Sequence, residues 1–262
     1  MISYCVAAYR PRYVRMLVAD LVRKTTVPFE VLIWLNVADD ELVAFLHQMA
    51  AAGAPIRIVG LTPENIGMRA YRHLFEAARY QMITQIDDDV VCVSPEIAQR
   101  AAAIFKRHPA IRQIVADVWQ DDFTSGARPG MDAYRCVDQS IGLYDGPIDG
   151  WFSIYHRSIL PLLQSVAYSQ YCFIGGVVQG QLRRRRLQGL LCTQMKVFHV
   201  IGPEYVSMFD MLEFEIAKYR ALGRSDIVDW YESARPTLPV PAMLRKHYAL
   251  ICDELERPPE MP

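Results

Sequence analysis

The stretch MITQIDDDVV occupies residues 82–91 and places three consecutive aspartates, Asp87, Asp88 and Asp89, directly after a mostly apolar run. A run of this kind is typical of a parallel strand that is buried on both faces. In an open α/β sheet, ligands bind outside the carboxyl ends of the strands. We therefore expect the three carboxylates to lie in a binding crevice, although an aspartate cluster is more commonly a solvated turn.

The segments before the aspartates alternate between strand and helix. Apolar runs predict strands at residues 2–8, 29–35, 55–61 and 81–87. Apolar residues at helical spacing predict helices at residues 14–26, 39–53 and 67–80. This alternation, with short connections, predicts a doubly wound α/β domain with a mostly parallel sheet.

The alternation breaks after the aspartates. The expected elements are a helix at 95–109, a strand at 111–119, a strand and then a helical turn at 150–160, a helix at 180–189 and a strand at 190–202. Residues 120–147 are expected to form a long loop, whose length favours a functional role. The remainder, 204–256, has helical spacing interrupted by a stiff proline-rich linker at 235–241.

Composition limits the class of protein. The chain has 262 residues, 52% of them hydrophobic, a formal net charge of -1 and six cysteines without a C-x-x-C pair. These values fit one domain with a small extension, free thiols in a reducing compartment, and no general nucleic-acid binding. The N-terminus does not resemble a signal peptide, and no uncharged apolar run could span a bilayer. We therefore expect a soluble cytoplasmic protein.

Three adjacent carboxylates repel one another and raise each other's pKa unless a cation or several hydrogen-bond donors neutralise them. Mg²⁺ and Mn²⁺ do this with oxygen ligands, typically one or two carboxylates together with the phosphates of a substrate. In an extended segment Asp87 and Asp89 point to one side and Asp88 to the other. One face could then hold a metal and a nucleotide, while Asp88 caps the backbone or reaches a sugar.

Four motifs, read together, make the pattern specific. They are CVAAYRPR (5–12), FEVLIWLNVADDE (29–41), ENIGMRAYRHLF (64–75) and QIDDDVV (85–91). In order and spacing they resemble the GT-A nucleotide-sugar glycosyltransferases, in particular family 2-like enzymes. The resemblance covers residues 2–91 and continues more weakly to about residue 203. It implies a GT-A domain at 1–203, with a nucleotide-binding half (1–91) and an acceptor half (92–203), followed by a helical extension at 204–262.

The resemblance also implies which residues bind the nucleotide sugar: Ala8, Tyr9, Arg10, Asn36, Asp39, Asn65, Gly67, Arg72, Asp87 and Asp88. The first three would line the base and ribose pocket. Asn36 stands where the family usually has an aspartate that reads the base, and Asp39, otherwise a helix N-cap, is the other residue for that role. The backbone N–H groups at Asn65 and Gly67 open a helix and would face a phosphate.

The same resemblance assigns Asp87 and Asp88 to the ribose and the sugar, and Asp89 to a divalent metal, Mn²⁺ or Mg²⁺. The family often adds a distant histidine from a late strand, and KVFHVIG supplies His199 at such a place. A lone histidine on an apolar strand is more often a core residue than a ligand. Its position favours the ligand, so we expect His199 to bind the metal.

The sequence departs from the family where inverting members carry a catalytic carboxylate pair. The matching stretch, YCFIGGVVQGQLRRRRLQG (171–189), contains no acid. Asp149 is the candidate for the base that takes the acceptor's proton, followed by Asp121 or Asp122. A retaining enzyme without a base at that place, or a catalytically inactive binding site, remains open. Trp151 is the candidate wall for an acceptor sugar, with core packing as the equal alternative.

The predicted function is metal-dependent transfer of a sugar from a nucleoside-diphosphate sugar to an acceptor hydroxyl. The acceptor is left open among a saccharide, a lipid-linked molecule and a small molecule, as are a homodimer and a peripheral membrane contact through the basic run at 183–186. A non-catalytic nucleotide-sugar-binding protein is the main alternative. A haloacid dehalogenase-type phosphatase would need its aspartate motif after the first strand, and a nucleotidylyltransferase would need a glycine-rich loop there.

Overall fold

The protein is described by a computed structural model that covers residues 1–124 and 128–257. The N-terminal part alternates between strand and helix: β1 (Ile2–Ala8), α1 (Pro11–Lys24), β2 (Phe29–Leu35), α2 (Asp40–Ala51), β3 (Ile56–Leu61), α3 (Ala70–Ala77) and β4 (Met82–Ile86). A 3₁₀ turn at Gly67–Arg69 leads into α3. All the elements predicted up to the aspartates are therefore present, and their ends differ by only a few residues.

The middle of the chain carries more strands than its sequence suggests: β5 (Val90–Val93), α4 (Ile97–Arg107), β6 (Ile111–Val118), β7 (Arg135–Asp138), β8 (Leu143–Asp145), β9 (Phe152–His156), α5 (Leu160–Ser165), α6 (Ile174–Arg184) and β10 (Gln188–His199). The predicted long loop at 120–147 contains β7 and β8, with 3₁₀ turns at Met131–Ala133 and Gln139–Ile141. A third 3₁₀ turn, Arg157–Ile159, precedes α5. Strands of three or four residues, such as these two and β5, are too short to show a clear apolar pattern.

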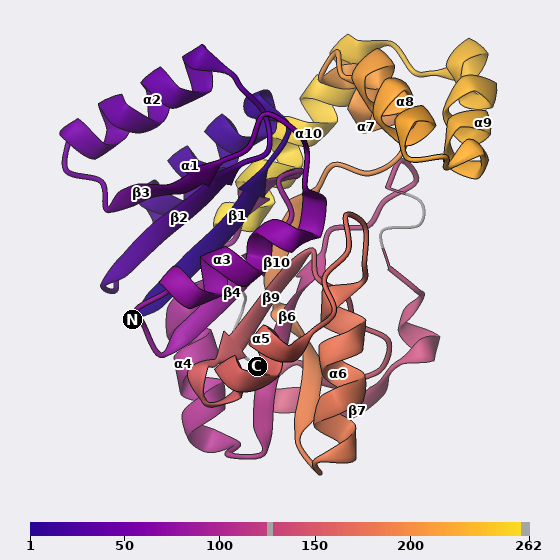
Figure 1. Cartoon of the computed structure of the whole chain (residues 1–262). Coiled ribbons are helices and arrows are strands. Elements are labelled where there is room, and N and C mark those ends of the chain that lie inside the picture. Colours follow the sequence, from indigo (N-terminus) through magenta and orange to yellow (C-terminus); the bar gives the residue numbers. More distant parts are fainter. Residues whose placement is uncertain (125–127, 258–262) are drawn as a thin grey trace.

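One sheet runs through the molecule in the order β3-β2-β1-β4-β9-β6-β10-β8-β7, and β5 pairs with β10 beside this path (Figure 1). The strands β3, β2, β1 and β4 are parallel, as a doubly wound half requires. Antiparallel strands enter in the second half, where β9 lies between β4 and β6. The carboxyl end of β4 therefore lies beside the start of β9, which brings the aspartates next to the loop before β9.

Helices cover both faces of the sheet. Alternate residues of β1, such as Val6, pack with the apolar faces of α1 and α2 in one cluster. The intervening residues, such as Cys5, pack with α3 and α6 in another. Every residue of β4 is buried, because both of its faces are covered.

The helix predicted at 180–189 begins earlier and ends earlier, as α6 at Ile174–Arg184. Three glycines in α6 lower its intrinsic helix propensity, which hides its first part from a reading of the sequence. Tertiary packing compensates, since Ile174, Val178 and Leu182 lie four residues apart and are fully buried against the sheet.

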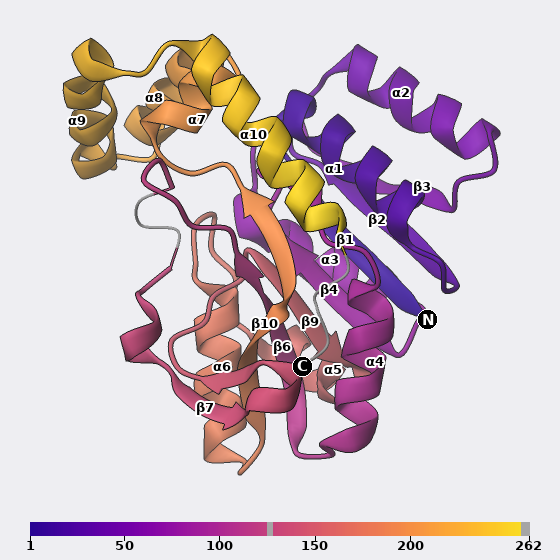
Figure 2. The same cartoon turned by 180° about the vertical axis from the view of Figure 1, so that it is seen from behind.

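The C-terminal part forms four helices: α7 (Pro203–Met208), α8 (Leu212–Ala221), α9 (Ser225–Ala234) and α10 (Pro241–Glu256). The predicted linker at 235–241 is shorter than expected, because Arg235–Thr237 forms a 3₁₀ turn and Pro241 begins α10. The helices α7 to α9 lie beyond the carboxyl end of β10 (Figure 1), and α10 returns alongside α1 (Figure 2). A separate apolar cluster joins these helices to Tyr13 of α1 and Phe198 of β10.

Within the described residues, every helix is too short or too polar to cross a lipid bilayer. All six cysteines are free, and Cys5, Cys92 and Cys192 are buried.

Candidate active site

The three aspartates form the turn between β4 and β5. The Asp87 N–H donates to the Trp151 carbonyl at 2.9 Å, and the Asp87 carbonyl accepts from the Val90 N–H at 3.1 Å. These bonds fix a turn in which successive side chains point in different directions. Asp87 and Asp89 face the end of β10, whereas Asp88 points back toward the connection between β1 and α1.

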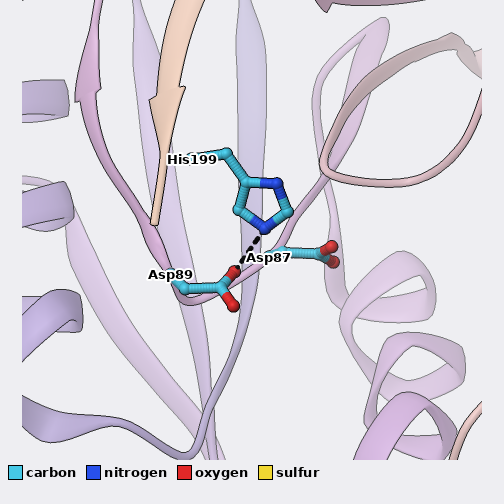
Figure 3. Close-up of side chains that lie close together, drawn as sticks. All are labelled: Asp87, Asp89 and His199. Atoms are coloured by element: carbon cyan, nitrogen blue, oxygen red, sulfur yellow. Dashed lines mark hydrogen bonds and ion pairs between the residues drawn. The ribbon is translucent and has the colours of Figure 1, made fainter. Parts of the chain in front are cut away.

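Asp87, Asp89 and His199 form a compact cluster, in which one ligand atom from each residue lies within 4.8 Å of the others. His199 Nε2 and Asp89 Oδ1 are 2.9 Å apart, and Asp87 lies beside them (Figure 3). Asp87 Oδ1 is buried without a hydrogen-bond partner among the described residues. A buried oxygen in that state calls for an explanation, and an ion is one. Two carboxylates suit Mn²⁺ and Mg²⁺, and the imidazole favours Mn²⁺ of the two, because Mg²⁺ prefers oxygen ligands.

Burial and mutual repulsion set the protonation of this cluster. Burial, together with the neighbouring charge of Asp89, raises the pKa of Asp87 to about 7. Burial also disfavours the charge on Asp89, but Arg10 and His199 outweigh it and hold the Asp89 pKa well below its usual range. Burial lowers the pKa of His199, but the Asp89 carboxylate outweighs this, so the His199 pKa is raised. With a pKa of about 7, Asp87 carries a proton for part of the time at neutral pH, and this proton reduces the repulsion within the cluster.

Arg10 is the protein's own counter-ion for the aspartate turn. Its guanidinium pairs with Asp88 and lies 3.1 Å from Asp89 Oδ2. It also binds Glu215 of α8, with Arg10 Nη2 3.2 Å from Glu215 Oε2. Lys218 Nζ lies 2.6 Å from the same Glu215 oxygen. Because buried charges must be paired, this chain of contacts ties α8 to the aspartate turn.

Asp88 connects the turn to the start of α1. One of its oxygens accepts the backbone N–H groups of Tyr9 and Arg10, each at 2.7 Å. Asp88 is only 5% exposed. In this structure Asp88 holds the loop after β1 against the aspartate turn. It therefore caps backbone N–H groups, one of the two roles expected for a side chain that points away from Asp87 and Asp89.

A cavity of about 500 Å³ opens over the cluster, a size typical of small-molecule sites. Most of the predicted site residues line it: Tyr9, Arg10, Asn36, Asn65, Gly67, Asp87, Asp88, Asp89, Asp149, Trp151 and His199. Three others lie outside it. Ala8 is buried in β1, the Asp39 side chain accepts the Leu42 N–H at 2.6 Å as the N-cap of α2, and Arg72 is exposed on α3.

The loop at 65–67 shapes one wall of the cavity. Gly67 has a φ of +58°, and a Cβ there would lie 1.9 Å from the Gln170 carbonyl oxygen, so only glycine fits. The Gly67 N–H donates to Asn65 Oδ1 at 2.8 Å, and the Ile66 N–H donates to Asn36 Oδ1 at 3.3 Å. These donors are already used inside the protein. In this structure the loop therefore positions Asn36, and its contact with a phosphate stays a prediction.

Asp149 reaches the cavity from the loop between β8 and β9. Its carboxylate accepts the Gly150 N–H at 2.7 Å and lies near the N–H groups of Gly175 and Gly176 at the start of α6. A Cβ on Gly175 would come within 2.4 Å of the Asp149 carbonyl carbon, so glycine is what lets the helix approach. Burial raises the pKa of Asp149 to about 6, although these N–H groups oppose the rise. The acid-free segment at 171–189 thus has a carboxylate beside it, supplied by another loop.

The other two acids considered as a base lie elsewhere. Asp121 Oδ2 accepts a hydrogen bond from the Tyr205 hydroxyl at 2.8 Å, Asp122 is exposed, and neither lines the cavity. Trp151 does line it but is only 7% exposed, and its indole N–H donates to the Ala116 carbonyl at 2.6 Å. Most of the Trp151 ring therefore packs in the core.

The cavity also contains residues that the sequence did not point to. They come from the C-terminal helices and include Glu215, Lys218, Tyr219 and Tyr231. Glu215 and Lys218, an acid and a lysine three residues apart on α8, were the available signal. Nothing local shows that this helix meets Arg10, which lies about two hundred residues earlier in the chain.

The sequence and the structure were compared with those of known proteins. No protein-family model matches the sequence, and no curated protein matches it either. Solved structures do match. TarS residues 1–349 from S. aureus, in complex with UDP-GlcNAc, superposes with a TM-score of 0.55 at 14% identity and covers 82% of this chain. The mannosyltransferase PcManGT from Pyrobaculum calidifontis, in complex with GDP-Man and Mn²⁺, superposes with a TM-score of 0.56 at 12% identity and covers 95%.

A third match is GalNAc-T7 with UDP, GalNAc and Mn²⁺, with a TM-score of 0.60, 11% identity and 91% of this chain covered. The chain has the GT-A fold. The fold class predicted from the sequence is therefore confirmed. This GT-A chain spans 64% of TarS 1–349, 79% of PcManGT and 51% of GalNAc-T7, and the identities are low, so the likeness concerns the fold.

Proposed function

We propose that this protein is a metal-dependent glycosyltransferase that moves a sugar from a nucleoside-diphosphate sugar to an acceptor hydroxyl. The observation that carries the proposal is the cluster of Asp87, Asp89 and His199, which lines a cavity of about 500 Å³ at the carboxyl ends of β4 and β10. The GT-A neighbours in complex with UDP-GlcNAc, or with GDP-Man and Mn²⁺, support it.

Each part of the cavity has a role in this proposal. Tyr9 and Asn36 bind the nucleoside, because they line the wall formed by the loops after β1 and β2. Asp87, Asp89 and His199 would hold the divalent cation, which would neutralise the charge of the diphosphate leaving group. These assignments use the side chains that the fold brings together and leave Ala8, Asp39 and Arg72 without contact to the donor.

We further propose that Asp149 is the general base of an inverting transfer. Among the three acids considered, it alone lines the cavity. Its carboxylate takes the proton from the acceptor hydroxyl as that oxygen bonds to the anomeric carbon, while the bond from that carbon to the diphosphate breaks. A base with a pKa of about 6 is largely ionised at neutral pH and still accepts a proton readily. A site that binds the donor without catalysis would have no need of this carboxylate.

Calorimetry with Mn²⁺ tests the metal site. Mn²⁺ must displace protons from Asp87 and from His199, whose pKa values are both raised, so its affinity should rise at least about tenfold between pH 6 and pH 8 as these groups lose their protons. Asp89→Ala should abolish binding and His199→Ala should weaken it. Asp229→Ala, which removes an exposed carboxylate on α9, is the matched control and should change nothing. Equal binding by all four proteins would show that the metal, if bound, lies elsewhere.

Turnover tests the reaction. We expect release of nucleoside diphosphate from at least one of UDP-glucose, UDP-GlcNAc and GDP-mannose, dependent on Mn²⁺ and abolished by Asp89→Ala. If the protein binds a donor but releases no nucleoside diphosphate, either in water alone or with any acceptor tried, the non-catalytic binding protein is favoured instead. Release of inorganic phosphate from simple phosphate esters would favour the phosphatase.

A further inference from the structure

Two aromatic side chains stand at the rim of the cavity with large exposed surfaces. Tyr171 is 42% exposed and Phe173 is 59% exposed, although most large apolar side chains of the described chain are buried. Both line the same cavity as the metal cluster and Asp149. Their rings are 5.6 Å apart and meet edge to face. Exposed aromatic surface at the mouth of a polar cavity is a common mark of a binding surface.

These rings stand next to the carboxylate proposed as the base. Phe173 directly precedes α6, and two residues later Gly175 lies against the Asp149 backbone, where a Cβ would come within 2.4 Å. The start of α6 therefore presents the aromatic pair and Asp149 to one space. A molecule that rests on the rings would bring its hydroxyl groups close to that carboxylate.

The segment that carries the rings is attached to the donor side of the cavity. The Gln170 carbonyl accepts the Met68 N–H at 3.1 Å, and the Gln170 side chain donates to the Asn65 carbonyl at 2.9 Å. On the other side, the Arg224 guanidinium lies 5.5 Å from the centre of the Tyr171 ring. Fixed at both sides, the aromatic pair can hold a second substrate in register with the donor.

The length of the apolar surface indicates what it binds. Along α6 it runs from Phe173 to Val177, which is 47% exposed, and then reaches Gly180 and the basic residue Arg184. Four residues of helix span about 6 Å, roughly the width of one sugar ring and far less than a lipid chain. A pyranose has a flat apolar face of C–H groups and a polar rim of hydroxyls. An aromatic pair beside carboxylates matches both of these surfaces.

We propose that Tyr171 and Phe173 form the acceptor subsite and that the acceptor is a saccharide, one ring of which stacks on Phe173. The proposal rests on the glycosyl transfer proposed above. It places the acceptor wall at the start of α6 rather than at Trp151, whose ring is mostly buried.

Saturation-transfer NMR on the full chain tests this, with UDP or GDP, whichever calorimetry shows to bind, and with diamagnetic Mg²⁺, because paramagnetic Mn²⁺ would broaden the saccharide signals. The probes are maltotriose, cellotriose and mannotriose, with farnesyl phosphate as the lipid probe. We expect at least one saccharide to bind through the C–H groups of a ring. Phe173→Ala should lower its affinity about tenfold, as the loss of one stacking contact implies. Phe173→Trp should retain binding, and Phe173→Leu, which stays apolar but is not flat, should not.

Two controls separate this proposal from the one it rests on. Leu250→Ala removes a side chain on α10 that is 65% exposed and does not line the cavity. This variant should leave saccharide binding unchanged. Each variant should bind Mn²⁺ and nucleotide as the wild type does. Saccharide binding that Phe173→Ala retains, binding of none of the three saccharides, or binding of farnesyl phosphate alone would refute the acceptor subsite. If the wild-type protein binds neither nucleotide nor Mn²⁺, the proposed glycosyltransferase function is refuted.

Discussion

Replacing Glu215 with glutamine should destabilise the protein far more than its place in the C-terminal part of the chain suggests. Glu215 is 2% exposed and binds both Arg10 and Lys218. The substitution keeps the shape but removes the charge that both cations share. Removing one partner of a buried ion pair costs about 3–5 kcal/mol. Since the amide retains one acceptor oxygen, we expect about 3 kcal/mol, a large part of the roughly 5–15 kcal/mol of a typical domain.

Urea unfolding at pH 7, followed by tryptophan fluorescence, measures this change. Glu213→Gln is the matched control, because Glu213 lies on the same helix, is 73% exposed and pairs only at the surface with Arg235. Surface pairs of this kind contribute little, so the control should unfold at the wild-type urea concentration. If the two variants unfold alike, the contact between α8 and Arg10 does not stabilise the fold and the reasoning fails.

The same variant gives a pH signature. Burial would raise the pKa of Glu215, but Arg10 and Lys218 outweigh it, so the folded-state pKa is lowered. A group with a lowered folded pKa contributes stability above its unfolded pKa, about 4.3, and loses that contribution as the pH falls toward the folded value. The advantage of the wild type over Glu215→Gln should therefore be full at pH 7 and shrink below about pH 4. An advantage that does not change with pH would contradict an ionic origin.

Two further predictions concern the cavity. Because burial raises the Asp149 pKa to about 6, kcat/KM at saturating Mn²⁺ should rise about tenfold from pH 5 to pH 7. Asp149→Asn should lose this pH dependence and lower kcat by a factor of about 10²–10⁴. A variant with an unchanged pH profile would exclude Asp149 as the base. Gly67→Ala should cost more stability in thermal unfolding than Gly53→Ala: both have positive φ, but only at Gly67 would the added Cβ collide, with the Gln170 carbonyl at 1.9 Å. Equal losses would mean that backbone strain alone matters there.

Local features of the sequence were sufficient for the strands and helices up to the aspartates and for the place of Asp87 and Asp89, whereas His199 was indicated only by the family resemblance. Apolar runs with strand and helix periods depend on burial of one face or two, and that requirement can be read along the chain. Asp87 and Asp89 follow a buried strand, and that alone placed them at the carboxyl edge of the sheet. Short elements were missed because three or four residues carry no period, and the first part of α6 was missed because its glycines lower its helix propensity.

What only the tertiary structure decided is which distant side chains share the cavity. Asp149 stands against the start of α6, where the sequence has glycines, and Glu215 meets Arg10 across about two hundred residues. No local pattern encodes either contact, because both depend on how separate elements pack and which charges are buried together. The order of residues determined the parallel half of the sheet and the edge that carries the acids, since periodicity and burial act locally. The partners of those acids followed from packing, since a buried charge must find its counter-ion wherever the fold brings one.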